Sequence, residues 1–336
     1  MPDSSGLNIE EKQSQENSLT LFLMLSGAVL MAWYNYGPKA LLLAAVCILT
    51  AVVSDFAGLL LVKSRKRKVY DLSAALTGLL IALMLPANFP LSMAAMGCIF
   101  AVVVGKLPFG GVKGELLIPA AAGLAFLSVS QPAALFDYPR VLEHSGLFTS
   151  DSVALLPGGE SLTAMLKVGD SMRLNSINIL KLITGAFPGP MGAGCIVVLL
   201  AGALYFVFKK PAALLNSLGM LTAAAVFAAL FPRILTGRLS SVVFELMSGA
   251  LIFSALFLIT DEITSPAKGL HRFIYGAFTG FFAMLLRYFG VFEEGVWFAV
   301  LVANAAWVAF SSPRPTFEEP QAQAVNPSGI GGNGNG

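Results

Sequence analysis

The chain has 336 residues, of which 56% are hydrophobic and only 12% are charged, and its mean hydropathy is +0.77. In soluble domains about a quarter of the residues are charged, so this composition excludes a soluble enzyme and indicates an integral membrane protein. The net charge of +2 is too small to indicate a nucleic-acid partner. At roughly 20 apolar residues per spanning helix, the chain has room for about ten spans.

Apolar runs bounded by charge, glycine or proline predict an all-α fold with ten transmembrane helices. In chain order they are Leu19–Tyr36, Lys39–Val62, Leu72–Leu85, Leu91–Lys106, Glu115–Ser130, Gly192–Phe208, Pro211–Phe231, Val242–Thr260, Phe273–Phe289 and Val296–Phe310. A polar, acidic tail, residues 1–18, precedes them and lacks the basic start of a signal peptide. Residues 311–336 are polar and rich in glycine and asparagine, which predicts a disordered tail.

One long connection, residues 131–191, separates five helices in residues 19–130 from five in residues 192–310. A connection of this length is usually functional. Basic residues near the spans predict its side of the membrane, because they collect in cytoplasmic loops. One set of segments holds Lys12, Lys63, Arg65, Lys66, Arg67, Lys68, Lys106, Lys113, Lys209, Lys210, Lys268, Arg272 and Arg314, and the other only Lys39, Arg233, Arg238 and Arg287. Both termini are therefore expected in the cytoplasm, with the long connection on the outer side of the membrane.

A weak internal repeat is visible. The third helix starts Asp71-Leu-Ser-Ala-Ala-Leu-Thr-Gly78 and the eighth contains Glu245-Leu-Met-Ser-Gly249, so both pair an acid with small residues. Five helices per half would make the two repeats inverted, an arrangement that places sites at the repeat interface. The alternative is ten helices without a duplication.

Other classes of chemistry lack their residue patterns. The segment Gly110-Gly-Val-Lys113-Gly has neither the spacing nor the Ser/Thr of a phosphate-binding loop. His144 and His271 cannot form the paired haem ligands of a membrane cytochrome, and Cys47, Cys98 and Cys195 each lie alone in an apolar run. We therefore expect no ATP site, haem, metal site or disulfide.

Ionisable residues within or beside the spans are candidates for an ion or electron path, because charge in a bilayer is costly. The candidates are Asp55, Lys106, Glu245, Asp261, Arg287 and Glu294. The alternative role for any of them is an interfacial anchor. For Asp55 the alternative is a carboxylate that reaches toward the basic residues at 63–68 or the headgroups.

Several motifs resemble one family of redox-driven ion pumps. They are Asp71-Leu-Ser-Ala-Ala-Leu-Thr-Gly78 through Pro86, Gly105-Lys106 with Phe109-Gly110-Gly111, Thr260-Asp261-Glu-Ile-Thr264-Ser265-Pro266, Ile274-Tyr-Gly276, Arg287-Tyr-Phe-Gly290, and Glu294-Gly295-Val-Trp-Phe-Ala-Val-Leu301 with Asn304. From about Asp71 to Asn304 the chain is similar to the D subunit of the Rnf electron-transport complex and to the paralogous B subunit of the sodium-translocating NADH:quinone oxidoreductase. The resemblance implies two inverted five-helix repeats. It also implies an electron-transfer subunit of a complex that couples ferredoxin and NAD redox chemistry to sodium or proton translocation.

The resemblance further implies FMN, which family members carry through a phosphoester to the Thr of a Ser-Gly-Ala-Thr stretch in the outer loop. The corresponding stretch here, from Asp151 to Lys167, lacks that consensus. Counted from Lys167, the family register places Ser161 at the acceptor position, and Thr163 is the nearest threonine hydroxyl. Lys167 and Arg173 are the expected phosphate contacts. A second, non-covalent flavin would need an Asn-rich sequence before the fifth helix, of which only Pro119-Ala120 is present.

The partners implied by the resemblance are other membrane subunits, an outer-face flavoprotein and a soluble NAD-linked subunit. Two alternatives stay open at this point. One is a secondary transporter without a cofactor, which the repeat and the missing acceptor motif both favour. The other is a structural subunit of the same complex that has lost its flavin.

Overall fold

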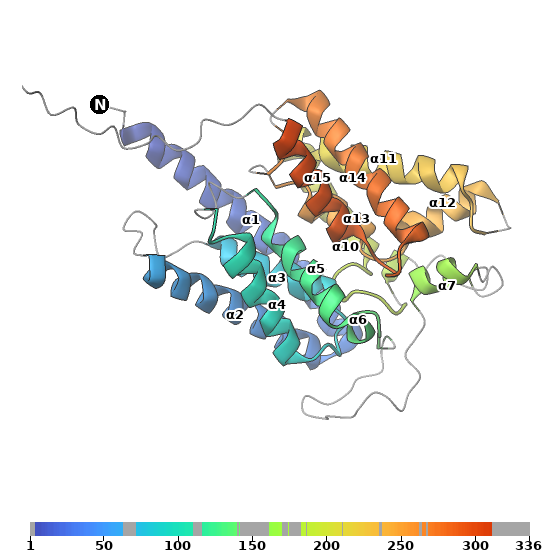
Figure 1. Ribbon diagram of the computed structural model, residues 1–336, viewed down its shortest axis with the longest axis horizontal. Helices are drawn as coiled ribbons and strands as arrows, with labels where there is room; N and C mark the ends of the chain where they lie inside the picture. Colours follow the sequence, from blue (N-terminus) through green and yellow to red (C-terminus); the bar gives the residue numbers. More distant parts are fainter. Residues whose placement is uncertain are drawn as a thin grey trace, which may run out of the picture.

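The computed structural model describes residues 4–62, 72–109, 116–139, 141, 161–169, 174, 183–185, 187–209, 211–234, 237–261, 264–266 and 268–310. The regular elements of this part of the chain are all helices, which confirms the predicted all-α class (Figure 1).

The helices fall into two groups on either side of the long connection. The first group is α1 (Ser4–Tyr36), α2 (Pro38–Val62), α3 (Leu72–Met84), α4 (Leu91–Gly105) and α5 (Pro119–Ser130). The connection holds α6 (Pro132–Leu135) and α7 (Leu162–Val168). The second group is α10 (Ile196–Lys209), α11 (Pro211–Leu230), α12 (Arg238–Met247), α13 (Leu251–Phe253), the π-helix η3 (Ser254–Leu258), α14 (Gly269–Phe289) and α15 (Val296–Phe310).

These helices match the ten predicted apolar runs. Four are long and apolar enough to cross a bilayer alone, within α1, α2, α11 and α14, and α12 with α13–η3 forms a bent fifth candidate. The other five, α3, α4, α5, α10 and α15, are apolar but shorter. Large apolar side chains such as Leu23, Val53 and Val226 are exposed on the outside, as lipid contact requires. The chain is a multi-pass membrane protein.

Several helices differ from the sequence expectation: α10, α12 and α14 begin at Ile196, Arg238 and Gly269, each four residues from the predicted start, and three further differences have a physical reason. The helix that holds the first span begins at Ser4, because the preceding polar segment continues it without a break. The fifth helix begins at Pro119 rather than Glu115, since proline is suited to the first helical position. The eighth run is two helices that meet at 66°. Gly249 lies at this break with φ +61°, a conformation that glycine adopts without steric penalty.

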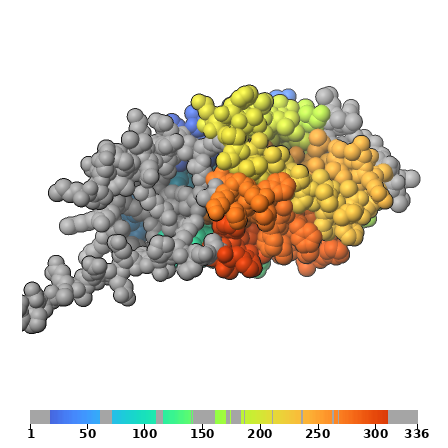
Figure 2. Space-filling model, turned by 90° about the horizontal axis from the view of Figure 1, so that it is seen from above, coloured from blue at the N-terminus to red at the C-terminus, as the bar shows by residue number. Residues whose placement is uncertain are grey.

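The pattern of neighbouring helices repeats between the two halves. In the first half α2 packs on α3 and α4, and α4 packs on α5. In the second half α11 packs on α12, η3 and α14, and α14 packs on α15. The halves meet where α5 contacts α15 and α1 contacts α10. Figure 2 shows α10, α11, α12, α14 and α15 as one continuous body. This correspondence supports the predicted duplication; the inverted orientation of the halves stays a prediction.

Close contact between α11 and α14 depends on glycine. A Cβ atom placed on Gly276 would lie 2.0 Å from the backbone oxygen of Asn216, and one on Gly280 would lie 2.3 Å from that of Met220. Small residues that let helix backbones approach are a common feature of membrane helix packing. Helices α11 and α14 therefore pack with their backbones in close contact.

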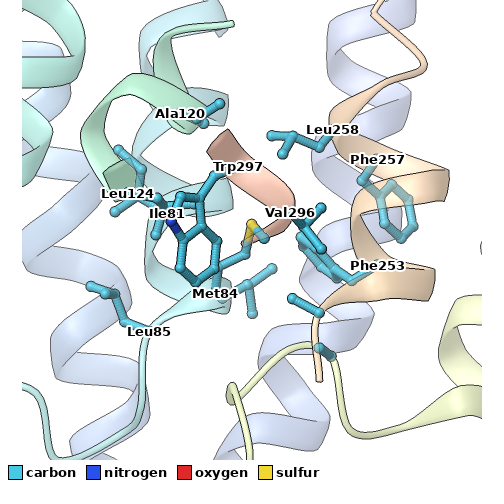
Figure 3. Close-up of a cluster of buried hydrophobic side chains, with 14 of the residues drawn as sticks. Ile81, Met84, Leu85, Ala120, Leu124, Phe253, Phe257, Leu258, Val296 and Trp297 are labelled. Carbon is cyan, nitrogen blue, oxygen red and sulfur yellow. The ribbon is translucent and has the colours of Figure 1, made fainter. Parts of the chain in front are cut away.

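An apolar core joins the halves around Trp297 of α15. Its side chain is 1% exposed and lies among Ile81 and Met84 of α3 and Leu124 of α5 (Figure 3). On the other side of this cluster Phe253 belongs to the broken segment. The broken helix and the ends of α3 and α5 are thus held at the junction between the halves.

Candidate functional site

A buried cluster of charges lies at the end of α14. Arg287 is 1% exposed, and both Glu245 of α12 and Glu294 are fully buried. Nη2 of Arg287 donates to the two carboxylate oxygens of Glu294 at 2.9 and 3.1 Å. Nη1 donates to the backbone oxygen of Glu245 at 2.8 Å and to Ser248 Oγ at 3.1 Å, and lies 3.4 Å from Glu245 Oε2. The planar guanidinium thus joins α12, α14 and the turn before α15.

A second arginine completes the charge balance of this cluster. Nη1 of Arg233 lies 3.6 Å from Glu245 Oε1, and its Nη2 donates to the backbone oxygen of Arg287 at 2.9 Å. Its guanidinium also stacks on the ring of Tyr288, 3.5 Å from the centroid. Two arginines therefore balance two glutamates, which offsets part of the large penalty for burying charge.

The break between α12 and α13 makes room for these side chains. A Cβ atom on Gly249 would lie 1.4 Å from Oε1 of Glu294 and 3.1 Å from Nη2 of Arg287. Burial raises the pKa of the Glu294 carboxyl above its ordinary value, and the charge and hydrogen bonds of Arg287 oppose that shift. The carboxylate, the guanidinium and the glycine therefore form one packed unit.

The first half contains a smaller charge cluster at the end of α4. Lys106 follows the last residue of α4 and is fully buried. Its Nζ donates to Ser73 Oγ of α3 at 2.7 Å and lies 3.3 Å from Asp55 Oδ2 of α2. Asp55 is 6% exposed, and its Oδ1 has no hydrogen-bond partner among the described residues. Asp55 thus faces Lys106; residues 63–68, its alternative partners, lie outside the described residues.

Asp261, the remaining candidate, lies apart from both clusters. Its Oδ2 accepts hydrogen bonds from the backbone nitrogen and the hydroxyl of Thr264, at 3.3 and 3.1 Å. Asp261 and Thr264 precede the first residue of α14, Gly269, whereas Arg287 lies 18 residues beyond Gly269, about 27 Å along that helix. The six path candidates therefore lie in three separate places: Asp55 with Lys106, Glu245 with Arg287 and Glu294, and Asp261 in the turn before α14.

Residues expected to contact FMN lie beside the charge cluster of the second half. Helix α7 starts after Ser161 and contacts α12. Ser161 Oγ donates to Glu293 Oε2 at 2.6 Å, accepts from the backbone nitrogen of Ala164 at 3.0 Å, and lies 3.0 Å from the Thr163 hydroxyl. Lys167 Nζ donates to the backbone oxygens of residues 290, 291 and 292 at 2.9, 2.8 and 3.4 Å. Arg173 lies outside the described residues.

These contacts do not fit a covalent flavin. A phosphoester needs an accessible hydroxyl, but Ser161 is 4% and Thr163 is 2% exposed, and both hydroxyls are engaged in hydrogen bonds. The ammonium of Lys167, although exposed, already donates to three backbone oxygens. Ser161 and Thr163 therefore act in this structure as buried contacts of α7.

Sequence reasoning missed a set of polar contacts around the π-helix. Asn216 Nδ2 of α11 donates to the backbone oxygen of Ile259 at 2.8 Å, and the neighbouring Ser217 hydroxyl donates to that of Ala255. Tyr275 donates its hydroxyl hydrogen to Asn304 Oδ1. The first two bonds satisfy carbonyls that the wider helix frees. The available signal was the presence of asparagine and serine within otherwise apolar runs.

Comparisons with known proteins agree with the architecture. The model of a family described as the NQR2, RnfD, RnfE family matches residues 4–312. The D subunit of the Na(+)-translocating ferredoxin:NAD(+) oxidoreductase complex of Acetobacterium woodii is 29% identical over 304 residues, which cover 90% of this chain and 90% of that protein. The proton-translocating counterpart of Clostridium ljungdahlii is 30% identical over 289 residues, covering 84% and 85%. The D subunit of the ion-translocating oxidoreductase complex of Ectopseudomonas mendocina is 29% identical over 315 residues, covering 91% and 90%.

Proposed function

The chain belongs to the NQR2, RnfD, RnfE family, and from this membership we propose that it is the D-type membrane subunit of an ion-translocating ferredoxin:NAD(+) oxidoreductase complex. The observation that carries the proposal is the family match over residues 4–312, together with relatives of that name that align over most of both chains. The partners we propose are the other membrane subunits, an outer-face flavoprotein subunit and a soluble NAD-linked subunit. We place the chain in a bacterial inner membrane with both termini in the cytoplasm.

Within such a complex the two charge clusters have distinct tasks. The arginine cluster stays charged, because a guanidinium group keeps its proton under all ordinary conditions. It therefore holds helix ends together. The Asp55–Lys106 pair lies in the first half, where it joins α2 and α3 at the end of α4. We propose this pair as the place where an ion or proton passes the first half, with Asp55 Oδ1 as its free acceptor.

A deletion and complementation experiment tests the function. In inverted vesicles from a host that encodes the complex, loss of this chain is expected to abolish both ferredoxin-dependent NAD reduction and the ion uptake coupled to it. Expression of the full chain is expected to restore both activities. A sodium ionophore and a protonophore then distinguish the coupling ion, since only the relevant one collapses uptake. Coupled ion uptake that persists without the chain would contradict the proposal.

A second candidate is a structural subunit of the same complex that carries no covalent flavin. Burial of the Ser161 and Thr163 hydroxyls favours it. Covalent FMN on this chain stays a proposal from the family resemblance. Fluorescence of the denatured chain in a gel, after coexpression with a flavin transferase, distinguishes the two: a fluorescent band supports the flavoprotein, and its absence supports the structural subunit.

A further inference from the structure

Helix α7 is a docked element of the outer connection, and its attachment has an apolar and a polar part. The apolar part is a small cluster separate from the main core. It consists of Leu162, Leu166, Leu174, Phe187 and Ile234, with Met165, Phe244 and Met247 at its edge. Two of these, Phe244 and Met247, belong to α12. Figure 1 shows α7 beside α12 and the end of α14.

The polar part attaches α7 to the turn that follows α14. Lys167, in the last turn of α7, donates to three successive backbone oxygens of that turn. At the other end of α7, Ser161 donates to the carboxylate of Glu293 at 2.6 Å. A hydrogen bond to a charged group is worth about 1.5–3 kcal/mol, more than one between neutral groups. Both ends of the short helix are therefore fixed to the same turn.

That turn also holds the buried arginine cluster. Glu293 precedes Glu294, whose carboxylate receives two hydrogen bonds from Arg287. The position of the turn decides where Glu294 meets Arg287, so whatever holds the turn also supports the cluster. Ser161 thus reaches the cluster through Glu293 and does not touch Arg287 itself.

The same hydroxyl cannot both serve this contact and carry a phosphate. Ester formation replaces the hydrogen of Ser161 Oγ by phosphorus, which removes the donor that Glu293 receives. It would also place phosphate oxygens against the Glu293 carboxylate in a site where Ser161 is 4% exposed. Two negative groups at this distance repel each other.

We propose that Ser161 is a positioning residue, the latch that holds α7 on the turn through Glu293, and not a flavin acceptor. Helix α7 then acts as a lid on the outer side of the arginine cluster. The hydroxyl of Thr163, hydrogen-bonded to Ser161 at 3.0 Å, supports the latch. This inference concerns α7 itself and stands whether or not the proposed function is correct.

The latch is tested on the full chain in native membranes by thiol labelling. Cys47, Cys98 and Cys195 are free and buried, which leaves the outer face open for an introduced cysteine. Leu166→Cys places a thiol at a fully buried position of α7, and Val168→Cys places one at a position that is 85% exposed. A water-soluble maleimide is expected to react slowly with the first and rapidly with the second.

Loss of the latch should expose the first thiol. With Glu293→Ala or Ser161→Ala, labelling of Leu166→Cys is expected to accelerate by about tenfold or more, as the loss of a charge-assisted hydrogen bond implies. The Val168→Cys control should not change. Ser161→Thr, which keeps the hydroxyl, should restore protection. Fast labelling in the parent, or equal labelling with and without Glu293, overturns the latch.

Two further measurements cover variants that disturb folding. Trypsin cleavage after Lys167, in chains that carry no introduced cysteine, is expected to be slow in the parent and faster in Glu293→Ala. Gel fluorescence after coexpression with a flavin transferase tests the second half of the inference. A band that disappears in Ser161→Ala overturns it, whereas no band, or a band retained in Ser161→Ala, supports it.

Discussion

The two buried charge clusters place a cation at matching positions and use different chemistry. Lys106 lies at the end of α4, the fourth helix of the first half, and Arg287 in the last turn of α14, the fourth span of the second. Lys106 presents a compact charge to Asp55 and Ser73, whereas the fork of Arg287 reaches Glu245, Ser248 and Glu294. A lysine exchanges its proton with a buried partner far more readily than an arginine. The comparison therefore separates an adjustable pair from a permanent clamp.

Removal of the arginine fork is expected to have the largest effect. Arg287→Met leaves Glu245 and Glu294 buried without their main partner, and breaking a buried pair costs about 3–5 kcal/mol. The variant should lose most of its folded population, measured as monodisperse protein after detergent extraction. Arg287→Lys keeps the charge without the fork and should recover only part of it. Parent-like yield and thermal stability of Arg287→Met would show that the cluster is no clamp.

The glycine at the helix break comes next. In Gly249→Ala the new methyl group meets Glu294 Oε1, and the residue must adopt φ +61°, which costs an L-residue about 1–2 kcal/mol. Glu294 has to move away from Arg287, so the melting temperature should fall. The matched control is Gly169→Ala, also in the left-handed region at φ +73°, where the nearest atom to the new Cβ is the Arg233 backbone oxygen at an ordinary contact distance of 3.8 Å, so that it isolates the backbone strain. An equal loss in both variants would mean that contact with Glu294 contributes nothing.

The lysine pair should tolerate change better. Lys106→Met leaves one carboxylate, that of Asp55 at 6% exposure, without its cation, whereas Arg287→Met leaves two that are fully buried, so the expected loss is smaller, about 1–3 kcal/mol. Asp55→Asn in the same chain should recover part of this loss, because both charges are then gone. Thermal stability measures the first effect, and coupled ion uptake in vesicles, which should stay low in both the single and the double variant, measures the second. A loss as large as that of Arg287→Met would remove the distinction between the clusters.

The sequence predicted the helices and the buried cations, but not the partners of those cations. The ten apolar helical segments were predictable because an apolar run is a local property. Lys106 and Arg287 were recognisable as candidates because charge is rare in spans. Their partners were not, since Asp55 and Ser73 lie on different helices from Lys106 and only packing brings them together. The resemblance fixed the family correctly, as the match over residues 4–312 confirms.

Other features depend on geometry that no sequence pattern carries. The eighth apolar run is continuous in the sequence and predicts one span. In the structure the break at Gly249 and the π-helix divide it. The Ser161–Glu293 contact joins residues 132 positions apart, which no local sequence pattern connects. Asp261 was predicted as a path candidate because it is an ionisable residue beside a span; its hydrogen bonds to Thr264 could not be predicted, and its role in a path stays a prediction.

The smallest expected effect is a dependence of α7 docking on pH. It concerns the Ser161–Glu293 latch, which lies beside the arginine cluster. Burial raises the pKa of Glu293 above its ordinary value, opposed by the Ser161 hydrogen bond and Lys167; Glu294 and Tyr138 also face this charge. Because the docked state binds the proton more tightly than the undocked state, docking is favoured at low pH and weakens as pH rises through the raised value. The labelling rate of Leu166→Cys, divided by that of Val168→Cys, should therefore increase between about pH 5 and about pH 8. A glutamate with the ordinary pKa of about 4.3 is already almost fully ionised over this range and would give no such increase. Glu293→Gln should abolish this increase, and a slope that survives it would assign the pH dependence to another group.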